Sequence, residues 1–248
     1  MGANHPGEDL VYSLAQVLLE NREVSLLVLS TPGRGQLEPH PMLHRLYSFK
    51  HHQPVWEDLS WRDRITAYGL AVLGAPGQLL ARVRQPVGLE DRRSLTANNG
   101  SWLRNLAWPG TNFAVIETPG CCTDMQLFLP EQFDELTFDD VTTPYQRTYL
   151  EHTLRLAEEH GTRVAILSPP LWRDRRTARP IIRLPRELLE QHNVPLIAQS
   201  GEALFGSAPD SDIQSYFYNA NHMNPNGTSR VTGAIAPHIR QLLAAASP

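Results

Sequence analysis

Cysteine is scarce in this sequence. Only two of the 248 residues are cysteines, and they are adjacent, at Cys121 and Cys122. An adjacent pair cannot close a long loop, and it cannot supply the four ligands of a structural zinc site. The sequence therefore predicts a fold that needs no disulfide bond, and the pair is interpreted as two small, half-buried side chains.

The chain also lacks long hydrophobic runs. It contains no stretch of about 18 consecutive apolar residues, as a transmembrane helix requires. Its start shows no basic segment followed by an apolar one, so it does not resemble a signal peptide. We therefore expect no membrane segment in this chain and a cytoplasmic location for the sequence as written. An envelope-associated location is expected if the true N-terminus lies upstream of Met1.

An excess of positive charge is absent as well. The net charge is -4 and the isoelectric point is about 6.2, which leaves no field to attract phosphate groups. Nucleic acid is therefore not expected as a partner. Four arginines, Arg173, Arg175, Arg176 and Arg179, form one short cluster, which is interpreted as a solvated loop rather than an anion site.

The composition that remains is that of an ordinary globular domain. Hydrophobic residues make up 41% and charged residues 19% of the chain. Both values are close to globular averages, so a disordered chain is excluded and a packed core is expected.

The first 30 residues predict a helix followed by a strand. Glu8–Glu20 carries leucine and valine at helical spacing, with the apolar stripe formed by Leu10, Leu14, Val17 and their neighbours. Ser25–Ser30 is a continuous apolar run of the kind that is buried on both faces of a parallel sheet. Residues 36–112, in contrast, show only scattered weak helical patterns, and we interpret them as a helical insertion without an internal repeat.

The clearest helix signal begins at Thr143. This residue is a good N-cap, Pro144 suits the first helical position, and Gln146 completes the pattern of a capping box. Gly161 follows the last periodic residues and is typical of a helix C-terminus.

Alternating helices and strands follow that helix. Val164–Ser168 and Val194–Ile197 are predicted strands, with a predicted helix at Arg186–Gln191 between them. This alternation favours parallel pairing of the two strands. A last helix is expected from Gly227 to Ala246, with a kink or break at Pro237.

The segment before the last helix reads Tyr-Phe-Tyr-Asn-Ala-Asn-His-Met-Asn-Pro-Asn-Gly, over residues 216–227. It resembles the final block of SGNH/GDSL hydrolases, in which an acid, two residues and a catalytic histidine precede a Leu-Asn pair and a glycine that opens the last helix. The branch most similar to it includes O-acetyl transfer and D-alanyl transfer proteins of bacterial envelopes. The preceding order of helices and strands, including the strand that ends Ser168-Pro169-Pro170, fits the same family.

This resemblance implies a three-layer α/β fold of the SGNH/flavodoxin-like kind, with one domain over residues 1–248 and the helical insertion at 36–112. It implies an ester hydrolase or O-acyltransferase that acts on a small-molecule or glycan ester, without a cofactor. His222 matches the catalytic base of the family. Asn219 stands where the family has its acid.

The sequence departs from the family at the nucleophile. No Gly-Asp-Ser or Gly-Ser-Ser turn follows the first strand, and Ser30 is followed by Thr31-Pro32, where proline removes a backbone donor. A registration that fits better aligns the segment Gly2–Asp9 with the second block of the family, so that Gly2 helps to bind the oxyanion. Ser30 then ends the third strand, and the first strand is missing from the chain.

Two other hypotheses remain open. The chain is either a non-catalytic descendant that binds a glycan or a protein, or a fragment of a longer protein. A sheet without its first strand would expose apolar edges, so a homo-oligomer is a further expectation. His40, His44, His51 and His52 lack a carboxylate pattern that would complete a metal site, and they are interpreted as surface residues.

Overall fold

The computed structural model describes residues 7–30, 49–65, 67, 125–220 and 222–244. Gly2, the cysteine pair and most of the expected insertion at 36–112 lie outside the described residues. By its internal contacts the chain forms two compact units, each built from three separate segments. Unit 1 comprises residues 1–87, 138–165 and 183–194, and unit 2 comprises residues 88–137, 166–182 and 195–248.

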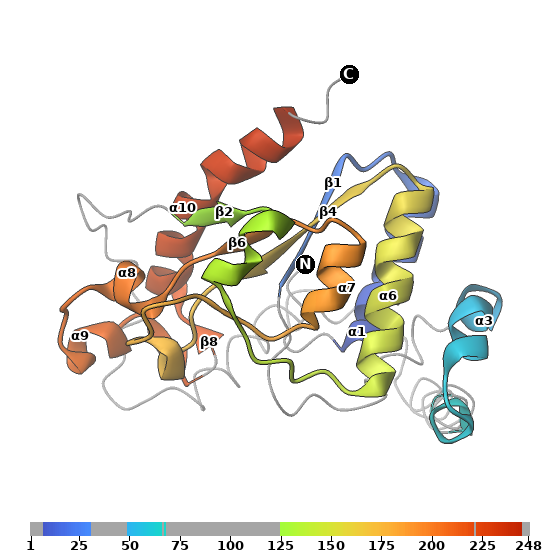
Figure 1. Ribbon diagram of the computed structural model, residues 1–248, viewed down its shortest axis with the longest axis horizontal. Coiled ribbons are helices and arrows are strands. Elements are labelled where there is room, and N and C mark those ends of the chain that lie inside the picture. The colour runs from blue at the N-terminus through green and yellow to red at the C-terminus, as the bar shows by residue number, and fades with distance from the viewer. Residues whose placement is uncertain (1–6, 31–48, 66, 68–124, 221, 245–248) are drawn as a thin grey trace, which may run out of the picture. The chain divides into compact units, whose positions relative to one another are not determined.

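Unit 1 is mainly helical in its described part (Figure 1). Its elements are α1 (Glu8–Asn21), β1 (Leu26–Ser30), α3 (Phe49–Asp58), α6 (Pro144–Glu159) and α7 (Arg186–Gln191), together with the first half of β4 (Arg163–Ser168). The predicted helices at 8–20, 143–161 and 186–191 and the predicted strand at 25–30 are therefore confirmed. Helix α3 falls within the expected insertion at 36–112.

Helix α6 begins where its capping sequence predicts. The Thr143 hydroxyl oxygen accepts a hydrogen bond from the Gln146 backbone N–H at 3.2 Å, and the Gln146 side chain accepts one from the Thr143 N–H, also at 3.2 Å. Gly161 follows the helix with a φ of +65°, a conformation that glycine adopts without strain. Local sequence signals therefore fix both ends of this helix.

Helix α1 packs side by side with α6, but on a different face from the one expected. Leu14, Val17 and Leu18 are 39%, 46% and 40% exposed, whereas Tyr12 is buried. The buried face also contains polar side chains, and the core that it joins is formed by Tyr12, Val55, Leu59, Ala67, Tyr145 and Tyr149. Packing against the tyrosines of α6, rather than the apolar periodicity of α1 alone, selected the buried stripe.

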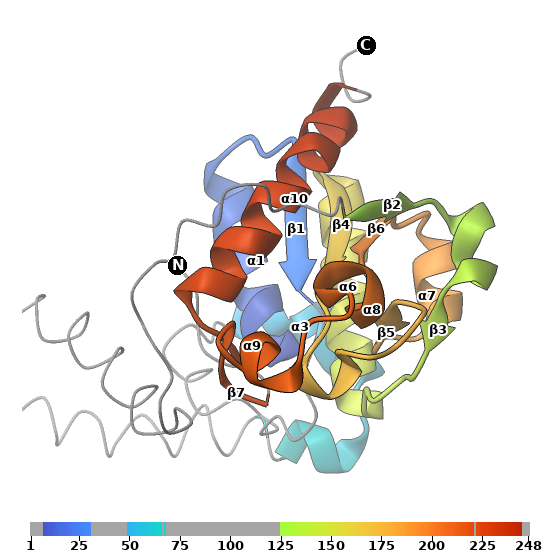
Figure 2. The same cartoon turned by 90° about the vertical axis from the view of Figure 1, so that its left-hand side faces the viewer.

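The main sheet has the neighbour order β1-β4-β6-β2, and strand β4 contributes to both units. In unit 2, β4 pairs in parallel with β6 (Leu196–Ala198), and β6 pairs antiparallel with β2 (Gln126–Phe128) (Figure 2). The chain is therefore an α/β protein with a mixed sheet, and the predicted parallel pairing is confirmed. Strand β1 lies at the end of the described sheet, so its residues Leu26–Leu29 are half-buried and not fully buried as expected.

Unit 2 contains several short elements and one long helix, α10. They are η1 (Pro130–Glu135), η2 (Trp172–Asp174), β5 (Ile181–Ile182), α8 (Gly201–Phe205), α9 (Asp210–Gln214), β7 (Phe217–Asn219), β8 (His222–Met223) and α10 (Pro225–Ala244). Strand β5 pairs with β3 (Thr137–Phe138) in a separate two-stranded sheet, and β7 pairs with β8 in another.

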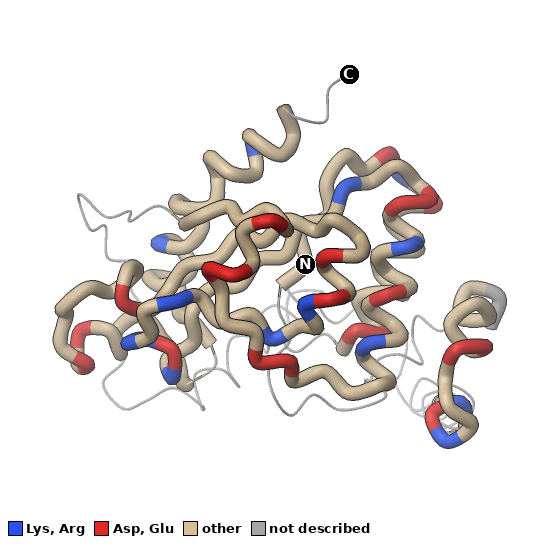
Figure 3. Tube along the Cα trace, viewed as in Figure 1, with Lys and Arg blue, Asp and Glu red and all other residues tan. Residues whose placement is uncertain are grey.

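Helix α10 runs through Pro237 as one helix, so of the expected kink or break, the break is absent. Its charged residues are Arg230 and Arg240. Figure 3 shows this helix tan over most of its length, the colour of residues other than Lys, Arg, Asp and Glu. Within the ranges that the structure describes, no helix has the length and apolar character needed to cross a membrane.

Candidate active site

The residues that carry the sequence resemblance lie on a small hairpin in unit 2. Strands β7 and β8 are antiparallel, with Phe217 opposite Met223 and Asn219 opposite His222. The register shifts by one residue between these pairs, which places a β-bulge at Tyr218. A bulge rotates the residues beyond it relative to the rest of the strand. The hairpin therefore presents Asn219 and His222 as a directly facing pair.

Two hydrogen bonds join this pair. The Asn219 Oδ1 atom accepts one from the His222 backbone N–H at 3.1 Å, and it lies 2.8 Å from His222 Nδ1. A backbone N–H can only donate, so the amide atom that faces it is an oxygen, and that oxygen can only accept from Nδ1. In the neutral imidazole, Nδ1 therefore carries the proton and Nε2 carries the lone pair. This is the tautomer that a general base acting through Nε2 requires.

Asn224 connects the base of the hairpin to helix α10. Its backbone N–H donates to the Tyr216 carbonyl at 2.9 Å, and its side-chain Nδ2 donates to the Ser215 carbonyl at 2.5 Å. Its Oδ1 accepts hydrogen bonds from the backbone N–H groups of Asn226 at 2.9 Å and Gly227 at 3.2 Å. The Asn224 side chain is therefore the N-cap of α10, and it also anchors the hairpin.

Gly227 is required for this connection. A Cβ atom at this position would lie 2.3 Å from the Tyr216 carbonyl oxygen, closer than real Cβ contacts allow. The backbone of the first turn of α10 therefore approaches the hairpin base at a distance that only glycine permits.

Three of the described serines in unit 2 have hydroxyl groups that bond to the backbone. The Ser168 hydroxyl donates to the Ile181 carbonyl, and the Ser215 hydroxyl donates to the Asp212 carbonyl. The Ser200 hydroxyl accepts from the Ala203 N–H as the N-cap of α8. Ser30 is exposed at the end of β1 in unit 1. Gly2, the expected oxyanion residue, lies outside the described residues.

Arg175 and Arg176 of the arginine cluster form surface ion pairs with Asp210 in unit 2. The Arg175 guanidinium lies 4.1 Å from the centroid of the Trp172 ring and donates to Asp210 at 2.6 Å. Arg176 donates to the carbonyls of Gly206 and Ala208 and to Asp210. The hydrogen bond from Arg175, with that from Arg176, lowers the pKa of Asp210 to about 2. These bonds fasten the loop before α9 to the segment that follows β4.

A second histidine with hydrogen-bonded partners lies in unit 1. His52 is buried, 1% exposed, and the expectation of a surface residue is wrong for it. Its Nε2 lies 3.0 Å from the Ser13 Oγ, and its Nδ1 lies 3.1 Å from the Tyr149 hydroxyl. The Ser13 hydroxyl donates to the Asp9 carbonyl at 2.9 Å, so its oxygen accepts from His52 Nε2–H. Nδ1 then accepts from Tyr149.

This arrangement does not activate Ser13. A base for a serine must accept its proton at Nε2, whereas here Nε2 already carries a proton. Burial, with a smaller contribution from the charge of His51, lowers the pKa of His52 to about 4, so the imidazole is neutral near pH 7. The Ser13–His52–Tyr149 chain is therefore a polar network in the core of unit 1.

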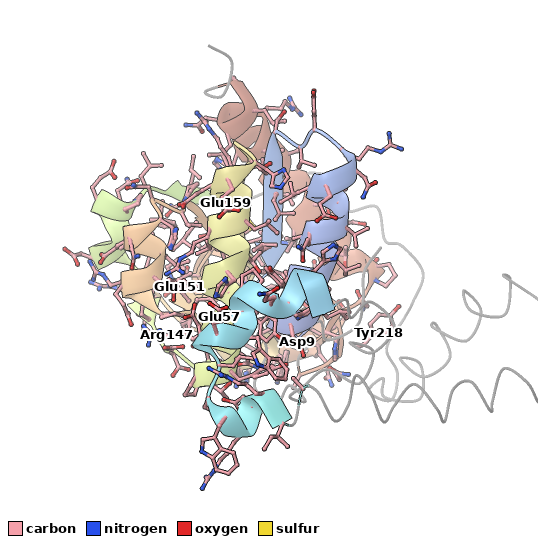
Figure 4. The ribbon with its side chains drawn as sticks, turned by 90° about the vertical axis from the view of Figure 1, so that its right-hand side faces the viewer. Asp9, Glu57, Arg147, Glu151, Glu159 and Tyr218 are labelled. Carbon is pink, nitrogen blue, oxygen red and sulfur yellow. The ribbon has the colours of Figure 1, made fainter. Side chains whose placement is uncertain are left out.

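Buried acids extend the same region. Asp9 lies in the first turn of α1 (Figure 4) and accepts a hydrogen bond from the Tyr145 hydroxyl at 3.0 Å. Burial, with the adjacent charge of Asp9, raises the pKa of Glu8 to about 8. Glu8 is therefore largely protonated near neutral pH. The network joins residues that are far apart in the sequence, such as Asp9 and Tyr145, so no local pattern predicts it.

Other histidines in unit 1 pair with carboxylates. His51 Nε2 lies 3.3 Å from Glu20, His152 Nε2 lies 2.8 Å from Asp58, and His192 Nδ1 lies 2.7 Å from Glu158. Each pair joins two elements. In the described ranges, no group of three or more His, Cys, Asp or Glu side chains is placed to hold a metal ion. His40 and His44 lie outside these ranges.

The comparisons with known proteins assign no relative to this chain. No protein-family profile matches the chain, no curated protein matches its sequence, and no solved structure matches its fold.

Proposed function

We propose that this chain is a homologue of the SGNH/GDSL ester hydrolases and O-acyltransferases, with weak or no activity of its own. In this proposal His222 is the general base and Asn219 orients it. The substrate class is a small-molecule or glycan ester, and the fold is the three-layer SGNH/flavodoxin-like arrangement. The observation that carries the proposal is the 2.8 Å contact between Asn219 Oδ1 and His222 Nδ1, which leaves Nε2 as the basic nitrogen.

The chemistry of such a site needs three further parts. A hydroxyl attacks the ester carbonyl, the basic imidazole nitrogen accepts its proton, and backbone or side-chain donors stabilise the oxyanion. Gly2 is the proposed oxyanion donor on the preferred registration of the sequence. The acyl group then leaves the hydroxyl for water in a hydrolase, or for a second hydroxyl in an acyltransferase.

Asn219 explains why the proposed activity is weak. An amide oxygen selects the tautomer and orients the ring, but it cannot stabilise the imidazolium that forms when the proton is accepted. Replacing the carboxylate of a Ser-His-Asp triad by an amide lowers the rate about ten-thousand-fold. The amide in that example selects the wrong tautomer, whereas the Asn219 oxygen faces Nδ1, so the loss here is expected to be smaller.

The decisive experiment is hydrolysis of p-nitrophenyl acetate by the wild-type chain and three variants. His222→Ala removes the base, and Asn219→Asp supplies the missing carboxylate. His160→Ala removes an exposed histidine of unit 1 and controls for imidazole groups that hydrolyse this ester without a site. We expect a low wild-type rate that His222→Ala abolishes and His160→Ala preserves, and an increase of at least about tenfold in Asn219→Asp.

Equal rates in the wild type and His222→Ala, without a gain in Asn219→Asp, would contradict the proposal. The second candidate function would then apply, in which the chain binds a glycan or a protein without cleaving an ester. Two observations favour it: the asparagine in the acid position, and the hydroxyls of Ser168 and Ser215, which donate to backbone carbonyls. Binding of the wild-type chain to immobilised acetylated and deacetylated polysaccharides would test it, with His222→Ala as the comparison.

A further inference from the structure

We infer that Asn224 is a positioning residue for His222, and that it fixes the imidazole in the Nδ1–H tautomer by holding the β7–β8 hairpin against helix α10. This inference rests on the proposed function for its catalytic meaning, because a general base acting through Nε2 needs the Nδ1–H tautomer. The geometry that carries it is local to unit 2.

The hairpin is too small to be stable alone. Strand β7 has three residues and β8 has two, and the register is shifted by a bulge between their paired positions. Isolated two-stranded hairpins are marginal in water even when they are longer. The pair of Asn219 and His222 therefore needs support from outside the hairpin.

Asn224 supplies that support from a fully buried position. It is 0% exposed, and its donor and acceptor atoms face different elements. Nδ2 donates to the Ser215 carbonyl on the chain that enters β7, while Oδ1 accepts from the first backbone N–H groups of α10. One rigid amide thus joins the incoming chain, the end of β8 and the start of a helix of 20 residues.

One substitution can separate the donor function of the Asn224 side chain from its acceptor function. In Asn224→Asp the carboxylate still accepts from Asn226 and Gly227, and a negative charge at a helix N-terminus is favourable. The same carboxylate cannot donate to the Ser215 carbonyl, and its second oxygen faces that carbonyl repulsively. The variant therefore keeps the helix cap and loses the hairpin anchor.

The experiment records long-range ¹H–¹⁵N correlation spectra of the full chain labelled with ¹⁵N-histidine, at a pH where the imidazoles are neutral. We expect the wild-type His222 signals to show the Nδ1–H tautomer. In Asn224→Asp we expect a several-fold larger population of the Nε2–H form, which a free imidazole prefers, and a lower melting temperature, because a buried hydrogen bond is replaced by a repulsive contact. His52, in unit 1, serves as the internal reference and should keep its Nε2–H signals.

Two further variants keep the inference falsifiable. Gly227→Ala should shift the His222 tautomer in the same direction, because the new Cβ atom pushes the Tyr216 carbonyl away. Ser200→Ala removes the N-cap of α8 in the same unit and lowers stability, but it should leave the His222 signals unchanged. An Asn224→Asp spectrum identical to the wild type would overturn the inference, as would an equal shift in Ser200→Ala.

The outcome is independent of esterase activity. If the tautomer shifts in Asn224→Asp but the wild type does not cleave p-nitrophenyl acetate, the proposed function fails and the positioning of His222 stands. If the wild type is active and the tautomer does not respond to Asn224→Asp, the positioning inference fails and the proposed function stands.

Discussion

His52 and His222 offer a comparison between the two units. Both imidazoles have an oxygen of a neighbouring side chain within 3.1 Å of Nδ1, but they have opposite tautomers. Tyr149 donates to Nδ1 of His52, so Nε2 of that residue carries the proton, whereas Asn219 accepts from Nδ1 of His222, so Nε2 is basic. A histidine beside a serine is therefore not by itself a catalytic pair. The identity of the second partner decides which nitrogen can act as a base.

Burial separates the two residues further. His52 is buried in the core of unit 1, and its hydrogen bonds contribute to the stability of the fold. The hairpin pair Asn219 and His222 is only half-buried, so its loss should affect stability little. Three measurements of the free energy of unfolding test whether the buried network of unit 1 contributes more to stability than the hairpin pair does.

The largest effect is expected at Glu8, next to the buried network. Because its pKa is raised to about 8 from 4.5, the folded chain retains a proton that the unfolded chain releases. The resulting stabilisation is fully present below pH 4.5 and is lost as the pH rises through 8, with a total of about 5 kcal/mol. Urea unfolding of the wild type and Glu8→Gln across this range measures it. If both proteins had the same pH dependence, Glu8 would not be a buried, protonated acid.

The next effect compares the two histidines directly. His52→Ala should lower the free energy of unfolding by about 4 kcal/mol, because it leaves a cavity and removes the imidazole between Ser13 and Tyr149. His222→Ala should lower it by less than about 1 kcal/mol, since this side chain is half-buried. Chemical unfolding of both variants beside the wild type provides the measurement. Similar losses would show that burial does not distinguish the two sites.

The smallest of the three effects is the acid response of His52. Its pKa is lowered to about 4 from 6.5, so the unfolded chain binds a proton more readily than the folded chain. The stabilisation is present above pH 6.5 and is lost as the pH falls through 4, by about 3 kcal/mol. The response of Glu8 has the opposite sign over part of this range, so the measurement is made in the Glu8→Gln background. Adding His52→Gln there should flatten the acid limb, and an unchanged limb would contradict the prediction.

The elements that could be predicted are those whose sequence signals, such as helix caps and apolar runs, lie in neighbouring residues. The Thr143–Gln146 capping box and Gly161 delimit α6, and the run at 164–168 becomes β4, because caps and continuous apolar runs depend on neighbours in sequence. The short strands β5, β7 and β8 were not predicted. Strands of two or three residues have no periodicity to detect, and their partners are set by the fold.

The features of the candidate site also fall into those that the sequence predicted and those that only the structure revealed. In the sequence, the family resemblance of residues 216–227 identifies Asn219 and His222 as a candidate pair, and the apolar periodicity after Gly227 predicts the helix that follows. Only the tertiary structure decided which nitrogen of each imidazole carries a proton, that Asn224 anchors the hairpin, and that His52 is buried. The first two outcomes depend on how the hairpin folds back, and the burial of His52 depends on Tyr149, which is 97 positions away in the chain.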